Sequence, residues 1–262
     1  MICRAYFFVL GVLQLCMVAA QEPYVSGKLS KEIRQPAQCW MAPASMLQAD
    51  QAMIGIIALQ PYGIADARQM YFFSCLPFDH QAAGFGLSRF WVKGYESLDL
   101  SLTYGRKLSG VWSLGAGITH RSEKFFDGLR YGSWKAVLNT RLQRPKWILG
   151  VYTSVNKPTN NTPFLLYADA TAGIDMGSSI YLDFSLRWET EHGIGSAASF
   201  QYCFQNSWLL ASRINTNPFS VAYETGYIKN GWIILVAGVQ TPGIGWTPGV
   251  KLARAFGKRK LS

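Results

Sequence analysis

The chain has 262 residues, of which 49% are hydrophobic and 15% are charged, against about 25% charged residues in an average soluble domain. This shortfall argues against an ordinary water-facing surface, yet no apolar run of about 20 residues after the N-terminus offers a spanning helix. The net charge of +10 comes from scattered cations rather than from a nucleic-acid-binding motif. We therefore expect a membrane β-barrel with no nucleic acid as its primary partner.

The N-terminus has the parts of a signal peptide. Arg4 supplies the positive charge, residues 6–13 the apolar core and residues 18–20 a small-residue cleavage site; the alternative is an N-terminal anchor helix. We expect a signal peptide at 1–20, an N-terminal extension or plug segment at 21–50, the barrel at 51–257 and a basic tail at 258–262.

The spacing of the cysteines does not indicate a metal or cofactor site. Cys39, Cys75 and Cys203 follow the signal peptide, and no pair of them has metal-ligand spacing. The sequence leaves open whether any two of them form a disulfide. We expect neither a metal nor another cofactor.

Residues 97–118 show the pattern that organises the chain. Leu98, Leu100 and Leu102 alternate with small or polar residues, and after a turn near residues 106–110 Trp112 and Leu114 resume the alternation. Two such runs around a short polar turn predict a β-hairpin with one oily face and one small or polar face.

Similar runs of about ten residues recur along the chain, separated by Gly, Pro and Asn, as in transmembrane barrels. Residues 40–65 indicate a first strand or a segment packed inside the barrel. The expected fold is an all-β, transmembrane antiparallel barrel of about fourteen strands, with twelve as the alternative count and an N-terminal segment that packs in the lumen as a further alternative. The expected strands are 51–59, 67–76, 83–92, 96–106, 111–121, 131–142, 146–156, 163–174, 178–189, 195–204, 207–214, 217–227, 231–240 and 247–256.

Alternation alone also fits a soluble β-sandwich, whose oily faces point inward. The signal peptide and the aromatic residues near the run ends favour an outer-membrane barrel of a Gram-negative cell. These aromatic residues are Tyr104, Trp112, Trp134, Trp147, Trp188, Trp208, Tyr227 and Trp232.

Charged residues in the runs keep to the polar face, which we expect to line the lumen. This avoidance suits a lipid-facing oily side, because a Lys or Arg at the bilayer midplane costs about 2–4 kcal/mol. The candidate lumen-facing residues are Asp99, Lys135, Arg141, Asp169, Asp183, Arg187, Glu189, Arg213 and Glu224.

Two features bear on what fills the lumen. Residues 231–240 are apolar on both faces, which suits a lumen that is partly apolar or plugged. Glycines such as Gly84, Gly115 and Gly117 fall on the inward face, where they make room for an inner segment or for curvature.

Several segments resemble a known family. Residues 84–90 (GFGLSRF), 104–108 (YGRKL), 114–118 (LGAGI) and 217–220 (NPFS) occur in the order found in PorV/PorQ-type outer-membrane proteins of Bacteroidota, within the FadL-like barrel superfamily. Residues 60–65 (QPYGIA) are similar to the family's Asn-Pro-Ala-Gly-Leu-Ala motif, with Gln60 in place of Asn. The resemblance implies a barrel with an N-terminal segment inside it, and either passage of hydrophobic molecules or an attachment role in type IX secretion.

The expected function is therefore a non-enzymatic, exported outer-membrane barrel. Its expected partners are membrane lipid, and either a hydrophobic small molecule or a secretion or envelope protein. One alternative is a structural or partner-binding barrel without transport. Another is a lipid hydrolase, because His120 and Ser122 lie two residues apart and share one face of a strand.

Overall fold

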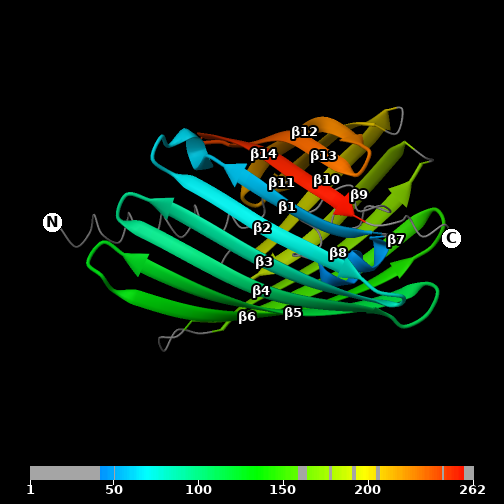
Figure 1. Ribbon diagram of the computed structural model, residues 1–262, viewed down its shortest axis with the longest axis horizontal. Helices are drawn as coiled ribbons and strands as arrows, with labels where there is room; N and C mark the ends of the chain where they lie inside the picture. The colour runs from blue at the N-terminus through cyan, green and yellow to red at the C-terminus, as the bar shows by residue number, and fades with distance from the viewer. Residues whose placement is uncertain are drawn as a thin grey trace.

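The computed structural model describes residues 42–49, 51–158, 164–176, 179–190, 193–204, 207–243 and 245–256. The expected signal peptide, the basic tail and Cys39 lie outside these residues. The described chain forms a closed antiparallel barrel of fourteen strands with two short 3-10 helices, η1 and η2 (Figure 1). This confirms the predicted fold class and its strand count. None of the helices in the described part of the chain is long and apolar enough to cross a membrane.

Each expected run corresponds to one strand. The largest difference is at β5, which continues to Phe125 because its pairing with β4 extends as far as Tyr95. The elements are η1 (Pro43–Gln48), β1 (Ala52–Leu59), η2 (Pro61–Gly63), β2 (Arg68–Pro77), β3 (Gln81–Val92), β4 (Tyr95–Lys107), β5 (Trp112–Phe125), β6 (Arg130–Gln143), β7 (Trp147–Pro158), β8 (Leu165–Asp175), β9 (Ile180–Glu189), β10 (Gly193–Phe204), β11 (Trp208–Thr216), β12 (Phe219–Lys229), β13 (Trp232–Thr241) and β14 (Gly245–Phe256).

Closure of the sheet leaves no strand edge unpaired. Every strand pairs with its neighbours in sequence, and β1 pairs with β14 from Ala52 opposite Phe256 to Leu59 opposite Gly249. The backbone groups in the paired parts of the strands bond within the sheet, as a hydrocarbon environment requires. We call the end at which β1 begins and β14 ends the near end, and the opposite end the far end.

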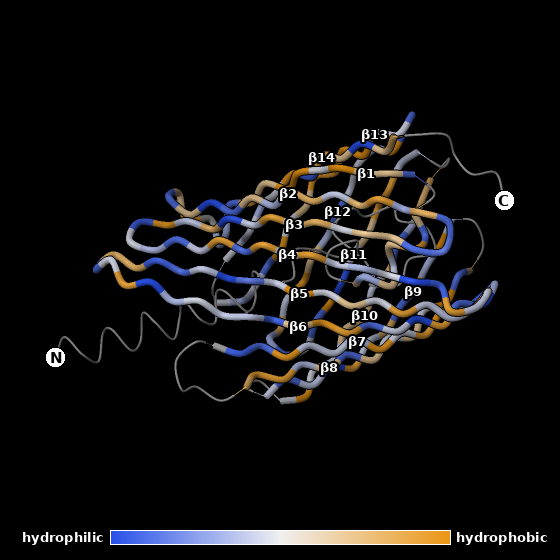
Figure 2. Tube along the Cα trace, turned by 60° about the horizontal axis from the view of Figure 1, so that its bottom comes forward, coloured by the Kyte–Doolittle hydropathy of each residue, from blue (hydrophilic) through white to orange (hydrophobic). Residues whose placement is uncertain are grey.

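Local sequence explains the strands and their turns. The hydropathy of the strand traces alternates along their length (Figure 2), as a period of two demands. At the near end, Asn230 and Gly231 join β12 to β13 with φ values of 52° and 78°. Two successive positive φ values define the tight hairpin turn that Asn-Gly favours.

The outer surface of the barrel is apolar. In β4 the even-numbered residues point outward, and Leu98 and Leu102 are 42% and 56% exposed, whereas the odd-numbered Ser97, Asp99 and Ser101 are buried. The aromatic residues expected at the strand ends lie on this outer surface too, Tyr227 being half-buried. Apolar side chains that point away from the interior exclude the sandwich alternative and identify a lipid-facing surface.

The interior has an apolar wall on one side. Its buried side chains come from β1–β3 and β11–β14, and they pack together with Met46, Leu47 and Ala49, which precede β1. This wall accounts for the two apolar faces of residues 231–240, since alternate residues of β13 point inward into it. The apolar wall consists of Met53, Ile57, Leu59, Tyr71, Phe73, Cys75, Ala82, Leu209, Ala211, Ala222, Ile233, Leu235, Ala237 and Ala253.

The outward orientation of Leu100 can be tested by placing a charge there. Leu100→Arg should destabilise the barrel in lipid vesicles by about 2–4 kcal/mol, because the guanidinium would lie within the apolar band. Leu108 is 62% exposed in the turn between β4 and β5, so Leu108→Arg should cost about 1 kcal/mol or less, as near an interface. Denaturant unfolding of the vesicle-inserted barrels measures both, and equal losses would contradict the outward placement.

Candidate functional site: the barrel interior and its inner segment

A segment from before β1 lies inside the barrel at the near end. Ala44 and Met46 of η1 are fully buried, and η1 contacts strands β2 to β6. The Ala44 backbone N–H donates to Oδ1 of Asn139 at 3.0 Å, and Nη1 of Arg141 donates to the Ser45 hydroxyl at 3.2 Å. Side chains of β6 therefore bind the first turn of η1 directly.

Further contacts fix the rest of η1. The Thr103 hydroxyl donates to the Met46 sulfur at 3.5 Å, and the Gln48 amide donates to the side-chain oxygen of Gln143. Because Thr103 belongs to β4 and Gln143 to β6, η1 bridges the inner faces of strands that are separated by β5.

Glycines on the inner face make room for η1. A Cβ at Gly115 would lie 2.3 Å from the Ala44 nitrogen, and one at Gly105 would lie 2.6 Å from the Pro43 carbonyl oxygen. Likewise, a Cβ at Gly84 would lie 2.6 Å from the Met46 sulfur. At these positions glycine accommodates the inner segment, whereas a Cβ at Gly117 would meet Thr103 of the neighbouring strand.

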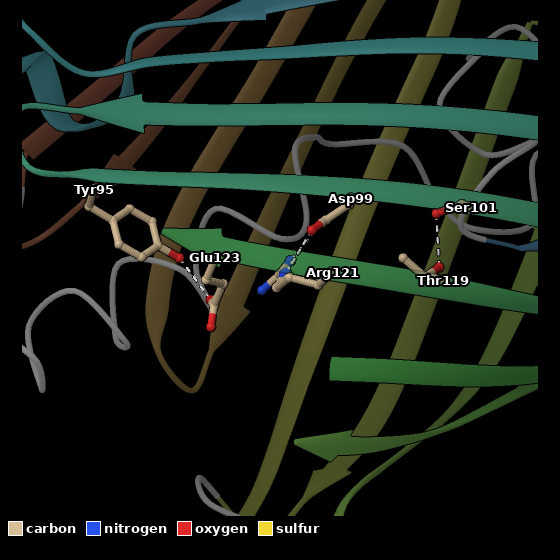
Figure 3. A network of polar contacts seen from close by, with 6 residues as sticks. All are labelled: Tyr95, Asp99, Ser101, Thr119, Arg121 and Glu123. Carbon is tan, nitrogen blue, oxygen red and sulfur yellow. Dashed lines mark hydrogen bonds and ion pairs between the residues drawn. The ribbon is translucent and has the colours of Figure 1, made fainter. Parts of the chain in front are cut away.

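A ladder of polar side chains runs along the inner face of β4 and β5 (Figure 3). Arg121 donates from Nε and Nη2 to the two carboxylate oxygens of Asp99, each at 2.7 Å. Toward the near end Ser101 and Thr119 share a hydrogen bond of 2.8 Å, and toward the far end the Tyr95 hydroxyl donates to Glu123 at 2.8 Å. We call these six residues the polar ladder.

A second polar group lies on the inner face of β8–β11. Buried Asp183 accepts a hydrogen bond from the Ser199 hydroxyl at 2.5 Å. Arg213 lies opposite Ser199 in the strand register and donates to Asn215 at 3.0 Å and to the Ser185 hydroxyl at 3.5 Å. These side chains form two sets of hydrogen bonds that lie next to each other on the three neighbouring strands β9, β10 and β11.

The remaining charged residues of β8 and β9 are placed as follows. Buried Asp169 accepts hydrogen bonds from Tyr167 at 3.0 Å and Thr171 at 2.6 Å, and it lies opposite Arg187 in the register. Arg187 donates to the Asn217 carbonyl. Glu189 is half-buried at the far end of β9.

Within the apolar wall lies one buried ion pair. Lys251 Nζ contacts the Glu224 carboxylate, and the two side chains are 1% and 0% exposed. They reach each other across β13, where Ala237 is the residue opposite Glu224. A charge in such surroundings is tolerable only because its partner is beside it.

The structure therefore locates all nine candidate charged residues. Asp99, Arg141, Asp169, Asp183, Arg187, Arg213 and Glu224 are buried, and Lys135 and Glu189 are half-buried. They do not gather into one centre: Arg141 binds η1, Asp183 and Arg213 belong to the β8–β11 group, and Asp169 lies opposite Arg187. Asp99 and Glu224 pair with Arg121 and Lys251.

Sequence reasoning missed the two cations that complete the ion pairs, Arg121 and Lys251. Arg121 carried a usable signal, because the hairpin register of β4 and β5 places it directly opposite Asp99. No such signal in the sequence points to Lys251, because Lys251 belongs to β14 and its partner Glu224 to β12, and these strands are not neighbours in the sheet.

Nothing in the described interior resembles a catalytic centre. Among the described residues no three His, Cys, Asp or Glu side chains are grouped to hold a metal ion. The His120 ring packs against outward-facing Trp134, with ring centroids 4.6 Å apart, which gives the His120–Ser122 hydrolase alternative no support. Cys75 and Cys203 are buried free thiols, so these two cysteines are not joined to each other.

The Asp99–Arg121 pair should contribute more to stability than an exposed pair. Asp99→Asn should lower the free energy of unfolding by about 3 kcal/mol, because it leaves a largely buried guanidinium without its carboxylate. The matched control is Glu96→Gln, which breaks the Arg89–Glu96 pair at side-chain exposures of 56% and 40% and should cost about 1 kcal/mol or less. Denaturant titrations compare the two, and a larger loss for Glu96→Gln would refute the ranking.

The role of the inward-facing glycines in making room for η1 can be tested by adding a side chain at one of them. Gly115→Val should displace η1 from β5 and cost about 1–3 kcal/mol through overpacking. Hydrogen exchange of the peptide that contains residues 42–49 should accelerate. A Cβ at Gly110 would contact nothing within 4 Å, so Gly110→Val should leave the exchange rate of that peptide unchanged. An unchanged exchange rate in Gly115→Val as well would show that the close fit at Gly115 does not hold η1 in place.

The chain resembles known proteins in its three-dimensional fold but not in its sequence. No family model matches the chain, and no curated protein matches it. Solved structures do match it: the toluene transporter TodX of Pseudomonas putida has a TM-score of 0.61 at 9% identity, covering 86% of this chain and 95% of that one.

Two further solved structures have a similar fold. The CymD monoaromatic hydrocarbon channel has a TM-score of 0.57 at 9% identity, covering 90% of this chain and 96% of that one. A FadL homologue of Pseudomonas aeruginosa has a TM-score of 0.57 at 10% identity, covering 88% and 95% respectively. The chain thus has the fold of outer-membrane β-barrels, including a FadL homologue.

Proposed function

We propose that the protein passes hydrophobic small molecules across the outer membrane without catalysing a reaction. The observation that carries this proposal is the apolar wall inside the barrel, exemplified by Ile57, Phe73 and Leu235. A channel for polar solutes is lined by polar groups, and a polar solute that met this wall would lose hydration without compensation. An apolar solute gains by contact with it.

An aromatic cluster at the far end supports the same class of solute. Phe90, Tyr95, Phe125 and Tyr131 point inward in adjacent positions of β3–β6, with successive ring centroids 5.9, 5.1 and 5.6 Å apart. We call these four residues the inner aromatic cluster. Aromatic rings bind apolar and aromatic solutes through large contact areas and edge-to-face geometry. TodX is a toluene transporter and CymD a monoaromatic hydrocarbon channel. Toluene and other monoaromatic hydrocarbons belong to this class of solute.

The position of η1 sets the condition for passage. A solute that entered at the far end would meet η1 at the near end, where Asn139, Arg141 and Thr103 hold it. Passage therefore requires that η1 shift or that the solute move beside it. Displacement breaks a few hydrogen bonds, each worth about 0.5–1.5 kcal/mol net, and it also removes Met46 and Leu47 from the apolar wall. The free energy needed to open the lumen is therefore the sum of these two costs.

Uptake of radiolabelled toluene by cells that lack other hydrocarbon channels tests this function. Expression of the protein should raise uptake, and the double variant Phe125→Ser, Tyr131→Ser should lower it several-fold because the inward rings are lost. Phe219 is an outward-facing aromatic residue at the same end, 52% exposed, so Phe219→Ser should leave uptake unchanged. The gel mobility of unheated and heated samples verifies that each variant is folded.

Uptake equal to that of cells without the protein would overturn the transport proposal. The second candidate is then a structural or partner-binding barrel, such as an attachment role in type IX secretion of the PorV/PorQ kind that the sequence resemblance implies. The bonds that fix η1 to β4 and β6 favour it, because a permanently seated segment suits a barrel that carries no solute. Co-purification of a stoichiometric envelope protein would support this candidate.

A further inference from the structure

A row of outward-facing residues crosses the outer surface of β2–β6 near the far end. The register places Arg68 opposite Trp91, Trp91 opposite Glu96, Glu96 opposite Lys124 and Lys124 opposite Arg130. Directly opposite residues of neighbouring strands share one face. These side chains therefore stand side by side on the surface that faces away from the lumen.

The row has more positive than negative charge. Its one carboxylate, Glu96, accepts a hydrogen bond from Nε of Arg89 at 2.7 Å, and Arg89 also lies over the Trp91 ring at 5.3 Å. The Arg68 guanidinium donates to the carbonyls of Ala65 and Ala67. Of the other acids near this row, Asp66 lies before β2 and Asp127 lies in the β5–β6 turn, where its carboxylate accepts the Leu129 N–H at 3.0 Å. Glu123, next to Lys124 in β5, points inward and accepts a hydrogen bond from the Tyr95 hydroxyl.

Lys124 and Arg130 are left facing each other. Both are exposed, and no ion pair or hydrogen bond of either side chain occurs within the described residues. Like charges directly opposite each other on a sheet are destabilising. An anion between the two side chains would convert this repulsion into two attractions.

The depth of the pair indicates where such an anion would come from. From Trp112 to Lys124 β5 advances twelve residues, or about 40 Å of strand and about 30 Å along the membrane normal at a tilt of about 40°. The apolar band of such barrels is about 25 Å tall. With Trp112 at one interface, Lys124 and Arg130 lie at the headgroup level of the opposite leaflet.

Beneath Lys124 and Arg130 the outer face continues with Ser122 and Gly132, and then with His120 beside Trp134. The apolar side chains around these positions suit acyl chains. Leu98, Leu100 and Trp134 face outward between the row and the middle of the strands, at 42%, 44% and 50% exposure. Lipid chains that pack there would place their headgroup beside Lys124 and Arg130. A soluble anion would gain nothing from this apolar surface, whereas a lipid gains from both.

We propose that the outer surface of β4–β6 at the far end binds a phosphate-bearing lipid, with its phosphate between Lys124 and Arg130 and its acyl chains on Leu98, Leu100 and Trp134. Arg and Lys form charge-assisted hydrogen bonds to phosphate, and the planar Arg fork binds two phosphate oxygens at once. This site is independent of the lumen and of any solute that passes through it.

Native mass spectrometry of the full chain in mild detergent tests the site with two probes, diphosphorylated lipid A and its dephosphorylated form. The double variant Lys124→Gln, Arg130→Gln should bind the diphosphorylated lipid about tenfold more weakly, because two charge-assisted contacts are lost. The control is Arg106→Gln, Lys107→Gln, which removes two exposed positive charges from the near end of β4. It should bind the lipid as the unmodified chain does.

Two outcomes would overturn the proposal. One is equal binding of the phosphorylated and dephosphorylated lipids by the unmodified chain, which would show that phosphate is not recognised. The other is an equal loss in both double variants, which would show that only net charge matters. Because all four substituted residues are exposed, heat-dependent gel mobility should confirm that both variants fold.

Discussion

Closure of the sheet is the constraint on which the rest of the structure depends. Fourteen strands in hydrocarbon must satisfy every backbone N–H and C=O among themselves, and the pairing of β1 with β14 achieves this. Once the sheet is closed, each side chain has only two directions available. The alternation of the sequence then sorts neighbouring residues to opposite sides, as in β4, where Leu98 and Leu100 face outward and Ser97 and Asp99 face the interior.

The interior that results is filled by three different arrangements. The apolar wall of β1–β3 and β11–β14 packs against the inner segment, polar groups satisfy one another along β4–β5 and β8–β11, and Glu224 and Lys251 neutralise each other within the apolar wall. The two polar arrangements follow from the cost of leaving a polar group unpaired away from water, and the apolar wall follows from the gain of burying apolar surface. The apolar wall and the inner aromatic cluster are the features on which the proposed passage of hydrophobic solutes rests.

The inner segment and the barrel are fitted to each other. Gly84, Gly105 and Gly115 leave the space that η1 occupies, and Asn139 and Arg141 bind its backbone and its serine. Outside the barrel, the far-end row of β2–β6 presents positive charge just beyond the apolar band. The proposed passage through the lumen and the proposed lipid site therefore use opposite faces of the same strands.

The sequence by itself determined the strands and their faces, because a period of two is a local property that Leu98, Ile180 or Trp232 expresses without reference to the rest of the chain. It also contained the Asp99–Arg121 pairing, since a hairpin register follows from its turn. Only the tertiary structure decided the contacts that cross other strands or enter the lumen. Lys251 contacts Glu224 across β13, and Arg141 donates a hydrogen bond to Ser45, 96 residues away in the sequence. Closure of the sheet brings these residues together, and no periodicity in the sequence predicts either contact.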